Sequence, residues 1–465
     1  MNAAALLMAL ALAAPQDSSR LTLAAALRGA LDRYPTVAAA RASRDQASAA
    51  VGEARAPLLP RLSLDAALTR YELPSIIYPL HGLNLASPPE FGTALAQGAA
   101  SLSYTLWDFG GRANRLRAAR ASEAAAGAAL DASSAALVAR VAGAYLRVLT
   151  IGGVLTAQDQ QLATLAAEAD RVHRLLAAGR AARVDVLRME ATVSRARADR
   201  EGTAANLDIA ERDLAQLADV PVESARADAL EPLHLRDSTT TPDRDALLAR
   251  ARAANPELLQ AQRGADAGRA QLAAARATRF PELRLQGSYV DRGIASTGWP
   301  PVAALKGEWQ AGVQLSYPLF TGGQRESSVR RADADARLRA ELARAAGLQL
   351  EQSVDRALGA AREARARVAA LTTAVAQFDE VVRIRRLSLE TGSGTQTDYL
   401  DAETDLLRAR ASLVDARHGE IAARVELARV TGDLTPVWLG AALVADTRTG
   451  GRADERTRGL KRERP

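Results

Sequence analysis

Three carboxylates beside two glycine-containing turns are the residues of this sequence whose type and spacing suggest a chemical role. Asp398 and Asp401 are three residues apart, a spacing that places two side chains on one face of a helix. Asp185 follows a similar turn in the first half of the chain. In a symmetric oligomer, Asp398 and Asp401 would form two stacked rings of carboxylates, and such rings set cation preference and constrict a pore. Asp185 and Asp398 also suit the first turn of a helix, where the dipole favours an acid.

No pattern typical of an enzyme accompanies these acids. The sequence has no cysteine, which excludes disulfides and thiolate metal sites, and its four histidines lack the spacing of metal ligands. It contains neither a nucleophile–base pair nor a phosphate-binding loop. We expect no catalytic activity, no cofactor and no metal.

The charge balance argues against nucleic acid as a partner. The chain carries 60 basic and 54 acidic residues, a net charge of +6. Residues 447–465 hold seven of the basic and three of the acidic residues, so four of the six surplus charges lie in this tail. The rest of the chain is nearly neutral and lacks the basic surface that nucleic-acid binding requires.

The elements that must position the three acids are two long helical hairpins. Proline, which breaks helices, is absent between Pro89 and Pro221 and again between Pro318 and Pro436. The larger apolar residues of both stretches have the three-and-four spacing of packed helices. The sequence predicts hairpins over about 112–219 and 324–431, each with a turn at a glycine.

The chain is an internal duplication. The segment Leu102–Trp107 corresponds to Leu315–Phe320, and a glycine pair follows each of them. The pattern Gly-x5-Asp-x-Leu that begins at Gly179 recurs at Gly392. We therefore predict a first repeat over residues 21–220, a linker over 221–243, a second repeat over 244–434 and a disordered tail over 435–465.

The first residues are typical of a secretory signal. The apolar run from Ala3 to Ala14 is too short to span a bilayer as a helix, and its small residues suit cleavage after Ala13, which would remove residues 1–13. No later segment approaches about 18 uninterrupted apolar residues. A mature chain that crosses a membrane would therefore cross it with strands.

Four segments alternate apolar and polar residues with the period of a β-strand. They cover about residues 60–70, 99–108, 281–291 and 308–320, close to the length of a membrane strand. Long loops over 73–97 and 293–307 accompany them, as in membrane barrels. Two soluble hairpins are the alternative. Because four strands cannot close a barrel, membrane strands would require other copies of the chain; a trimer would supply twelve and a dimer eight.

The duplicated order of strand, strand, long helix, glycine turn and helix resembles the TolC family of outer-membrane efflux channels. The motifs that carry this resemblance are Tyr-x-Leu-[Trp/Phe] before a Gly-Gly pair and Gly-x5-Asp-x-Leu at the hairpin turns, each present twice between Leu21 and Leu434. The resemblance implies a mostly α fold with a membrane β-barrel part, in which a homotrimer forms a 12-stranded barrel that a long α-helical barrel continues. It places the channel in the outer membrane of a Gram-negative bacterium, in contact with outer-membrane lipid, with the helices in the periplasm.

The same resemblance implies partners and site residues. The hairpin turns would meet a periplasmic adaptor protein, which couples the channel to an inner-membrane pump of the RND or ABC type in an efflux or type I secretion system. Asp398, Asp401 and Asp185 would line the periplasmic entrance, and adaptor contact would fall on Gly179, Gly392, Gly394 and Arg183.

Two positions depart from the family pattern. Arg188 stands where the first copy would match Asp401, and Gly394 stands where the family's archetype has an arginine that helps to latch the entrance. We expect Arg180 or Arg183 to take part in the latch instead.

Two other classes of protein stay open. A periplasmic adaptor would carry a single hairpin between split β-rich halves, whereas this chain places a pair of strands before each of two hairpins. A soluble coiled-coil scaffold would need neither four alternating strands nor a signal segment.

Overall fold

The computed structural model of the protein describes residues 20–76, 91–236, 243–295 and 302–445. The predicted signal peptide, residues 1–13, lies outside these ranges, as does the basic end of the tail, residues 446–465.

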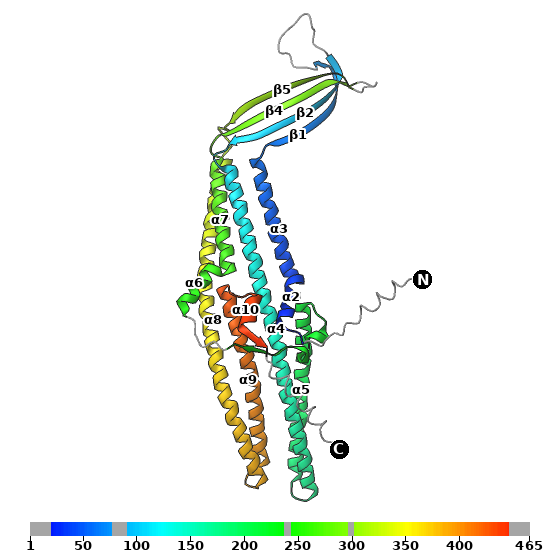
Figure 1. Cartoon of the computed structure of the whole chain (residues 1–465), viewed down its shortest axis with the longest axis vertical. Coiled ribbons are helices and arrows are strands. Elements are labelled where there is room, and N and C mark those ends of the chain that lie inside the picture. Colours follow the sequence, from blue (N-terminus) through cyan, green and yellow to red (C-terminus); the bar gives the residue numbers. More distant parts are fainter. Residues whose placement is uncertain (1–19, 77–90, 237–242, 296–301, 446–465) are drawn as a thin grey trace, which may run out of the picture. The chain divides into compact units, whose positions relative to one another are not determined.

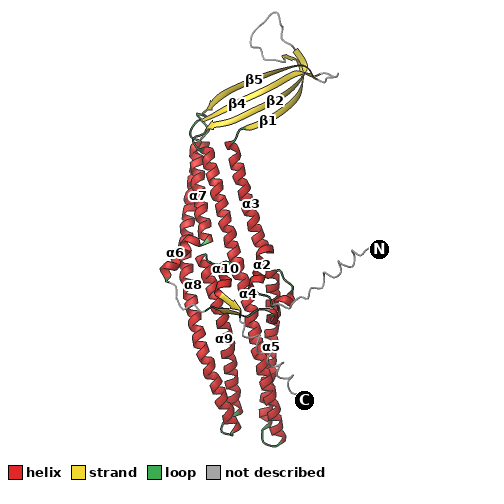
Figure 2. Ribbon diagram, viewed as in Figure 1, coloured by secondary structure: helices red, strands yellow, loops and turns green. Residues whose placement is uncertain are grey.

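The chain runs twice through one order of elements, two helices, two strands and two long helices (Figures 1 and 2). Helices α4 and α8 each have 67 residues, and α5 and α9 each have 36. The first copy comprises α2 (Leu23–Arg33), α3 (Pro35–Arg55), β1 (Arg61–Ile76), β2 (Phe91–Trp107), α4 (Gly111–Ala177) and α5 (Arg183–Ala218). The second comprises α6 (Arg244–Ala254), α7 (Pro256–Ala277), β4 (Glu282–Ala295), β5 (Val302–Ser316), α8 (Gln324–Glu390) and α9 (Gln396–Thr431).

Helix α4 contains a window of 18 residues with a mean hydropathy of 1.4, so among the described helices it alone could cross a membrane by length and composition. Charged residues such as Arg140 and Arg147 interrupt the apolar residues of this helix, so it contains no long uninterrupted apolar run. Val138, Val141 and Tyr145 of α4 are buried in a core shared with other helices. The window is 39% buried in the single chain, so packing in that core accounts for part of its apolar composition.

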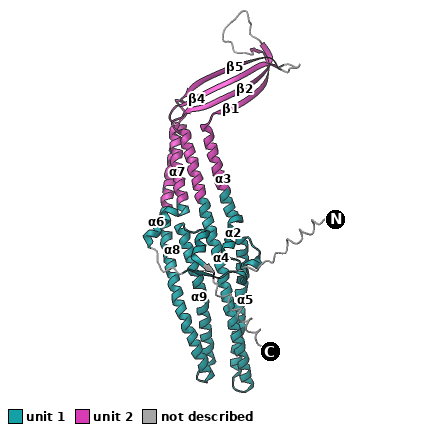
Figure 3. Ribbon diagram, viewed as in Figure 1, with its two compact units in different colours: residues 1–41, 129–258, 347–465 teal, residues 42–128, 259–346 magenta. Residues whose placement is uncertain are grey.

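The compact units of the structure do not follow the two sequence repeats. Unit 1 comprises residues 1–41, 129–258 and 347–465, and unit 2 comprises residues 42–128 and 259–346 (Figure 3). Each unit therefore takes segments from both repeats, and in unit 2 the two copies meet where β2 pairs with β4.

Unit 2 contains a four-stranded antiparallel sheet with the strand order β1-β2-β4-β5. The pairing of β2 with β4 joins the two repeats. The strands are longer than the sequence predicted, since β1 continues to Ile76 and β2 begins at Phe91. Much of each predicted loop is therefore strand.

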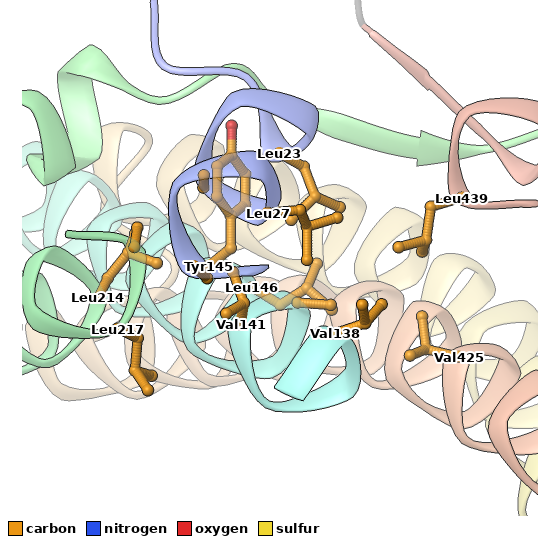
Figure 4. Packing of buried hydrophobic residues seen from close by; sticks show 14 of the residues in the cluster. Leu23, Leu27, Val138, Val141, Tyr145, Leu146, Leu214, Leu217, Val425 and Leu439 are labelled. Atoms are coloured by element: carbon orange, nitrogen blue, oxygen red, sulfur yellow. The ribbon is translucent and has the colours of Figure 1, made fainter. Parts of the chain in front are cut away.

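Unit 1 is held by an apolar core that collects α2, α4, α5, α9 and α10 (Pro436–Ala442) (Figure 4). Leu27 of α2 and Val141 of α4 are 1% and 0% exposed. Leu214 of α5 and Val425 of α9 close the same core from the long helices. The spacing of these residues follows the helical period, as the sequence predicted.

The linker and the tail contain more structure than the sequence predicted. The linker forms the 3-10 turns η2 (Val222–Ala225) and η3 (Ala227–Ala229) and the strand β3 (Leu233–Leu235). The prediction of a disordered tail from residue 435 is wrong for its first part, because α10 and β6 (Leu443–Ala445) follow at once and β6 pairs with β3. Leu439 and Leu443 enter the core of unit 1, and their burial stabilises this segment.

The hydroxyl of Tyr145 joins three segments of unit 1. It donates a hydrogen bond to the carbonyl oxygen of Leu21 or of Glu231, at 2.7 and 2.8 Å, and accepts one from the backbone N–H of Glu231 at 2.8 Å. Burial raises the pKa of the Tyr145 hydroxyl well above its usual range, so the proton is retained. Helix α4 thereby fixes both the start of the chain and the linker.

We expect the substitution Tyr145→Phe to lower the free energy of unfolding by about 1–3 kcal/mol, because it removes the hydroxyl from buried backbone partners. Thermal unfolding and limited proteolysis of residues 218–236 would measure the loss. Tyr34→Phe is the matched control, since the Tyr34 hydroxyl accepts a single exposed hydrogen bond from Arg140. Equal effects of the two substitutions would contradict the role of Tyr145.

Candidate functional site

One face of the sheet in unit 2 is apolar across all four strands. Residues directly opposite each other on paired strands share a face, and one row consists of Leu64, Ala100, Tyr289 and Trp309. Leu64 and Trp309 are 84% and 75% exposed in the single chain. Strand alternation adds further apolar residues to this face: Leu62, Leu68, Leu102, Tyr104, Leu285, Val313 and Leu315.

The opposite face of the sheet is polar. Its equivalent row consists of Ser63, Ser101, Ser288 and Gln310. Charged and amide side chains continue it on both sides of this row, and Arg292 lies 3.5 Å from Glu308. An apolar face backed by a polar one is the pattern of a membrane barrel, with lipid on one side and water on the other.

Asp291 is an exception on the apolar face, in register with Gly98 and Gly307. Its Oδ1 is buried and has no hydrogen-bond partner among the described residues. Asp291 lies two residues beyond Tyr289, away from the end of β4 that adjoins α7.

Aromatic side chains gather where the strands of unit 2 meet its helices. Trp107 packs edge to face against Phe109, with ring centroids 6.0 Å apart, and Phe109 stacks on Phe280 at 4.7 Å. Leu319 and Phe320 are 90% and 88% exposed. Aromatic girdles of this kind mark the level at which a membrane strand meets the water interface.

The turns of the two hairpins, both in unit 1, end their first helices in the same way. Gly179 has φ +68° and Gly392 has φ +78°, a conformation that glycine adopts without strain. Arg180 N donates to the carbonyl oxygen of Leu175 at 2.8 Å, and Ser393 N donates to that of Ser388 at 2.9 Å. These bonds satisfy carbonyls that the helix ends would otherwise leave unpaired.

Gly394 is required by the second turn for a different reason. A Cβ at this position would lie 2.9 Å from the Cβ of Ser388, and the backbone N–H of Gly394 donates to the carbonyl oxygen of Ser388 at 3.0 Å. The turn closes too tightly for any larger residue. An arginine at this position would not fit this backbone.

Asp185 and Asp398 hold the starts of the returning helices. The Oδ2 of Asp185 accepts a hydrogen bond from Ala182 N at 3.2 Å. The Oδ2 of Asp398 accepts one from Thr395 N at 3.4 Å, while the Thr395 hydroxyl accepts one from Asp398 N at 3.1 Å. This reciprocal pair is a capping box. Local helix capping therefore accounts for both acids, and Arg385 lies 4.0 Å from Asp398.

Asp401 has no such local explanation. Its side chain is exposed one turn beyond Asp398 on α9, and it makes no hydrogen bond or ion pair within the described part of the chain. Arg183 is also exposed at the start of α5. The structure brings Asp398 and Asp401 onto one helix and places Asp185 on the other hairpin.

Polar residues that the sequence analysis missed connect the two hairpins. The guanidinium of Arg171 on α4 donates to both carboxylate oxygens of Glu168 at 2.9 Å and, through Nη2, to the side-chain oxygen of Gln396 on α9 at 2.8 Å. The hydrogen bonds to Glu168 raise the pKa of Arg171. The three-residue spacing of Glu168 and Arg171 could have indicated an ion pair on one helix, but nothing in the sequence indicates the bond to Gln396.

An apolar contact accompanies the polar one. Leu400 on α9 packs against the cluster of its own hairpin, which contains Val382 and Tyr399, and also against the cluster of the first hairpin, which contains Leu165 and Met189. The equivalent residue of the first repeat, Leu187, is 54% exposed. The leucine of the second Asp-x-Leu motif is therefore packed within the chain, whereas the leucine of the first motif is exposed.

These features define a membrane-sheet protein extended by long helical hairpins, the class to which outer-membrane channels belong. The family model described as outer membrane efflux protein matches residues 26–219 and 247–433. The chain is 25% identical over 421 residues to Outer membrane protein TolC of Escherichia coli, covering 86% of this chain and 80% of that protein. It is 30% identical over 433 residues to Protein CyaE of Bordetella pertussis, covering 90% and 86% of the two chains.

The crystal structure of the outer membrane protein VceC from Vibrio cholerae has the same fold. The TM-score is 0.74 at 20% sequence identity, over 88% of this chain and 96% of that one. The chain belongs to the outer membrane efflux protein family, and it is a protein of the outer membrane. The resemblance to the TolC family is confirmed, and the family is one of transport channels rather than enzymes.

We expect Gly392→Ala to destabilise the second turn by about 1–2 kcal/mol, because a Cβ is unfavourable at its positive φ. Hydrogen exchange of the amides in residues 388–400 would become faster in the variant. The matched control is Gly419→Ala in helix α9, which follows the turn, where a Cβ would meet nothing within 4 Å. That control should gain up to about 1 kcal/mol from helix propensity, and faster tip exchange in both variants would contradict the argument.

Proposed function

We propose that the protein is a trimeric exit channel of the outer membrane, a passive conduit for an efflux or type I secretion system. The observation that carries this proposal is the four-stranded sheet with one apolar face, one polar face and two unpaired edges. Three copies would close a 12-stranded barrel in lipid, with the polar face around a water-filled lumen. The helices would continue this lumen as a tunnel through the periplasm.

The duplicated hairpins indicate which surfaces meet between protomers. Within one chain, Gln396 and Leu400 of the second hairpin contact the side of the first hairpin that carries Arg171. In a closed ring of alternating hairpins, the equivalent residues Arg183 and Leu187 would contact the side of the neighbour's second hairpin that carries Ile384.

The exposed residues fit this arrangement. The equivalents of Glu168 and Arg171 on α8 are Val381 and Ile384, which are 41% and 49% exposed in the single chain. Val184 and Leu187 on α5 are 51% and 54% exposed. A neighbouring protomer would cover both apolar surfaces, which supports a ring of hairpins.

The ring can be tested by cross-linking, since the natural chain has no cysteine. In the double variant Arg183→Cys, Ile384→Cys, a short bismaleimide should produce a ladder of covalent species that ends at the trimer. The pair Arg171→Cys, Gln396→Cys is the matched control and should react only within one chain, because these residues contact each other there. A ladder ending at another size, or no ladder, would contradict the trimer.

The periplasmic entrance is assigned to the hairpin tips. Asp401, exposed and without a local partner, and Asp398 would form two rings of carboxylates in the trimer, with Asp185 on the adjacent hairpins. Opening would move the two hairpins of a protomer apart. That movement has to break the hydrogen bond between Arg171 and Gln396 and uncover Leu400.

The same tips would meet a periplasmic adaptor protein, which connects the channel to an inner-membrane pump. The proposed contact surface includes Gly179, Gly392, Gly394 and Arg183, which lie in or beside the two turns. Energy for export would come from the pump, because a passive channel supplies none.

We expect purified trimers in planar bilayers to conduct small, cation-preferring currents. Replacing Asp398 and Asp401 with Ala should weaken cation preference and block by a divalent cation, since it removes both carboxylate rings. Asp405→Ala is the matched control on α9, where Asp405 pairs with Arg408 of its own helix. Unchanged block in the double variant would refute the entrance assignment, whereas a monomer without conductance would refute the channel itself.

A further inference from the structure

Unit 1 contains a pocket that the channel function does not use. It lies where η3 and β3 cross the long helices, and it has a volume of about 920 Å³. Its walls come from α4, α5, α8 and α9 as well as from the linker. This volume is within the range of pockets that bind small organic molecules.

Two consecutive glycines shape the wall of this pocket. A Cβ on Gly152 would lie 2.7 Å from the Cβ of Ala227 in η3, and one on Gly153 would lie 3.1 Å from Val414 of α9. Glycine inside a helix costs about 1 kcal/mol relative to alanine. At these two positions the absence of a Cβ allows the linker and α9 to approach α4 closely, and these segments together enclose the pocket.

The lining combines an apolar floor with a surplus of positive charge. Apolar lining residues come from four helices: Leu149, Leu207, Val368, Val414 and Ile421. Five arginines and three carboxylates also line the pocket, which leaves two positive charges in excess. Such a surface suits a molecule with an apolar body and a negative group.

The three carboxylates already have partners in unit 1. Glu211 accepts a hydrogen bond from Ala227 N at 2.9 Å. Asp228 lies 3.5 Å from Arg226, and Glu420 lies 3.4 Å from Arg424.

The two arginines Arg236 and Arg417 have no carboxylate partner within the described part of the chain, although both line the pocket. They are therefore the groups left to bind an anion.

His418 adds a neutral polar group to the same wall. Burial, together with the nearby His234, lowers the pKa of His418 to about 4. The Nδ1 of His418 lies 2.7 Å from the hydroxyl oxygen of Thr150, which is also 2.8 Å from the carbonyl oxygen of Leu146. With His418 neutral, the arginines carry the positive charge of the pocket.

We propose that this pocket binds a soluble amphipathic organic anion, a carboxylate or sulfonate on an apolar body. The anionic group would lie at Arg236 and Arg417, and the apolar body would lie against Leu149, Val414 and Ile421. The C-terminal tail is an unfavourable occupant of the pocket. Residues 447–465 carry seven basic and three acidic residues, and the pocket is also positively charged. The inference is independent of the channel proposal, because it concerns a different surface of unit 1.

The test uses the full-length protein in lipid nanodiscs and benzophenone-4-carboxylate as a photoreactive probe. We expect labelling to map to residues 149–156 and 414–421. The double variant Arg236→Gln, Arg417→Gln should bind the probe at least about tenfold more weakly, since it removes both charge-assisted hydrogen bonds to the anionic group. Arg212→Gln is the matched control, because Arg212 pairs with Asp208 on the surface of α5.

Two further arms make the result decisive. The uncharged analogue 4-methylbenzophenone should label the pocket less than the carboxylate, and inorganic phosphate should not compete, because it lacks an apolar body. Filling the wall with Ala369→Trp should abolish labelling in a protein whose thermal unfolding is unchanged. Labelling outside the pocket, equal labelling by the uncharged analogue, or full labelling of the arginine variant would each overturn the proposal.

Discussion

The unpaired edges of the sheet are the constraint on which the rest of the structure depends. In the described chain, β1 pairs only with β2 and β5 only with β4, so both outer edges present backbone N–H and C=O groups without partners. Each such group costs several kcal/mol in hydrocarbon, where water cannot satisfy it. A sheet with an exposed apolar face can therefore enter lipid only when other copies complete it. The proposed trimer would meet this condition, because each outer edge would pair with the edge of a neighbouring copy.

The duplication shows how one design can serve two different contacts. The second hairpin uses Gln396 and Leu400 to bind the first hairpin of the same chain. The first hairpin carries Arg183 and Leu187 at the equivalent positions and leaves them exposed. In the proposed trimer, the exposed Leu187 would instead contact the apolar surface of α8 that carries Val381 and Ile384. A duplicated chain can thus distinguish contacts within a protomer from contacts between protomers.

Local patterns predicted the elements well and the long-range contacts poorly. The long helices, the four alternating strands and the turns at Gly179 and Gly392 follow from periodicity and backbone conformation, which neighbouring residues determine. The hydrogen bonds of Tyr145, the pairing of β3 with β6 and the bond from Arg171 to Gln396 join residues far apart in sequence. No local spacing encodes such contacts. The helix and strand over residues 436–445 were not predicted for the same reason, since their stability comes from burial in a core formed by distant segments.

Asp185 and Asp398 have a role within the single chain, whereas the role proposed for Asp401 requires an oligomer. Capping bonds to Ala182 and Thr395 account for Asp185 and Asp398 within a single chain, so these two residues would be favourable even in an isolated hairpin. Asp401 gains nothing comparable, because it lies beyond the first turn of α9 and remains exposed. An exposed carboxylate costs a monomer little, but symmetry would place three of them around one axis, where their repulsion opposes closure and attracts cations. If the proposed trimer forms, the energetic effect of Asp401 would therefore arise in the assembly, which neither the local sequence nor the single chain displays.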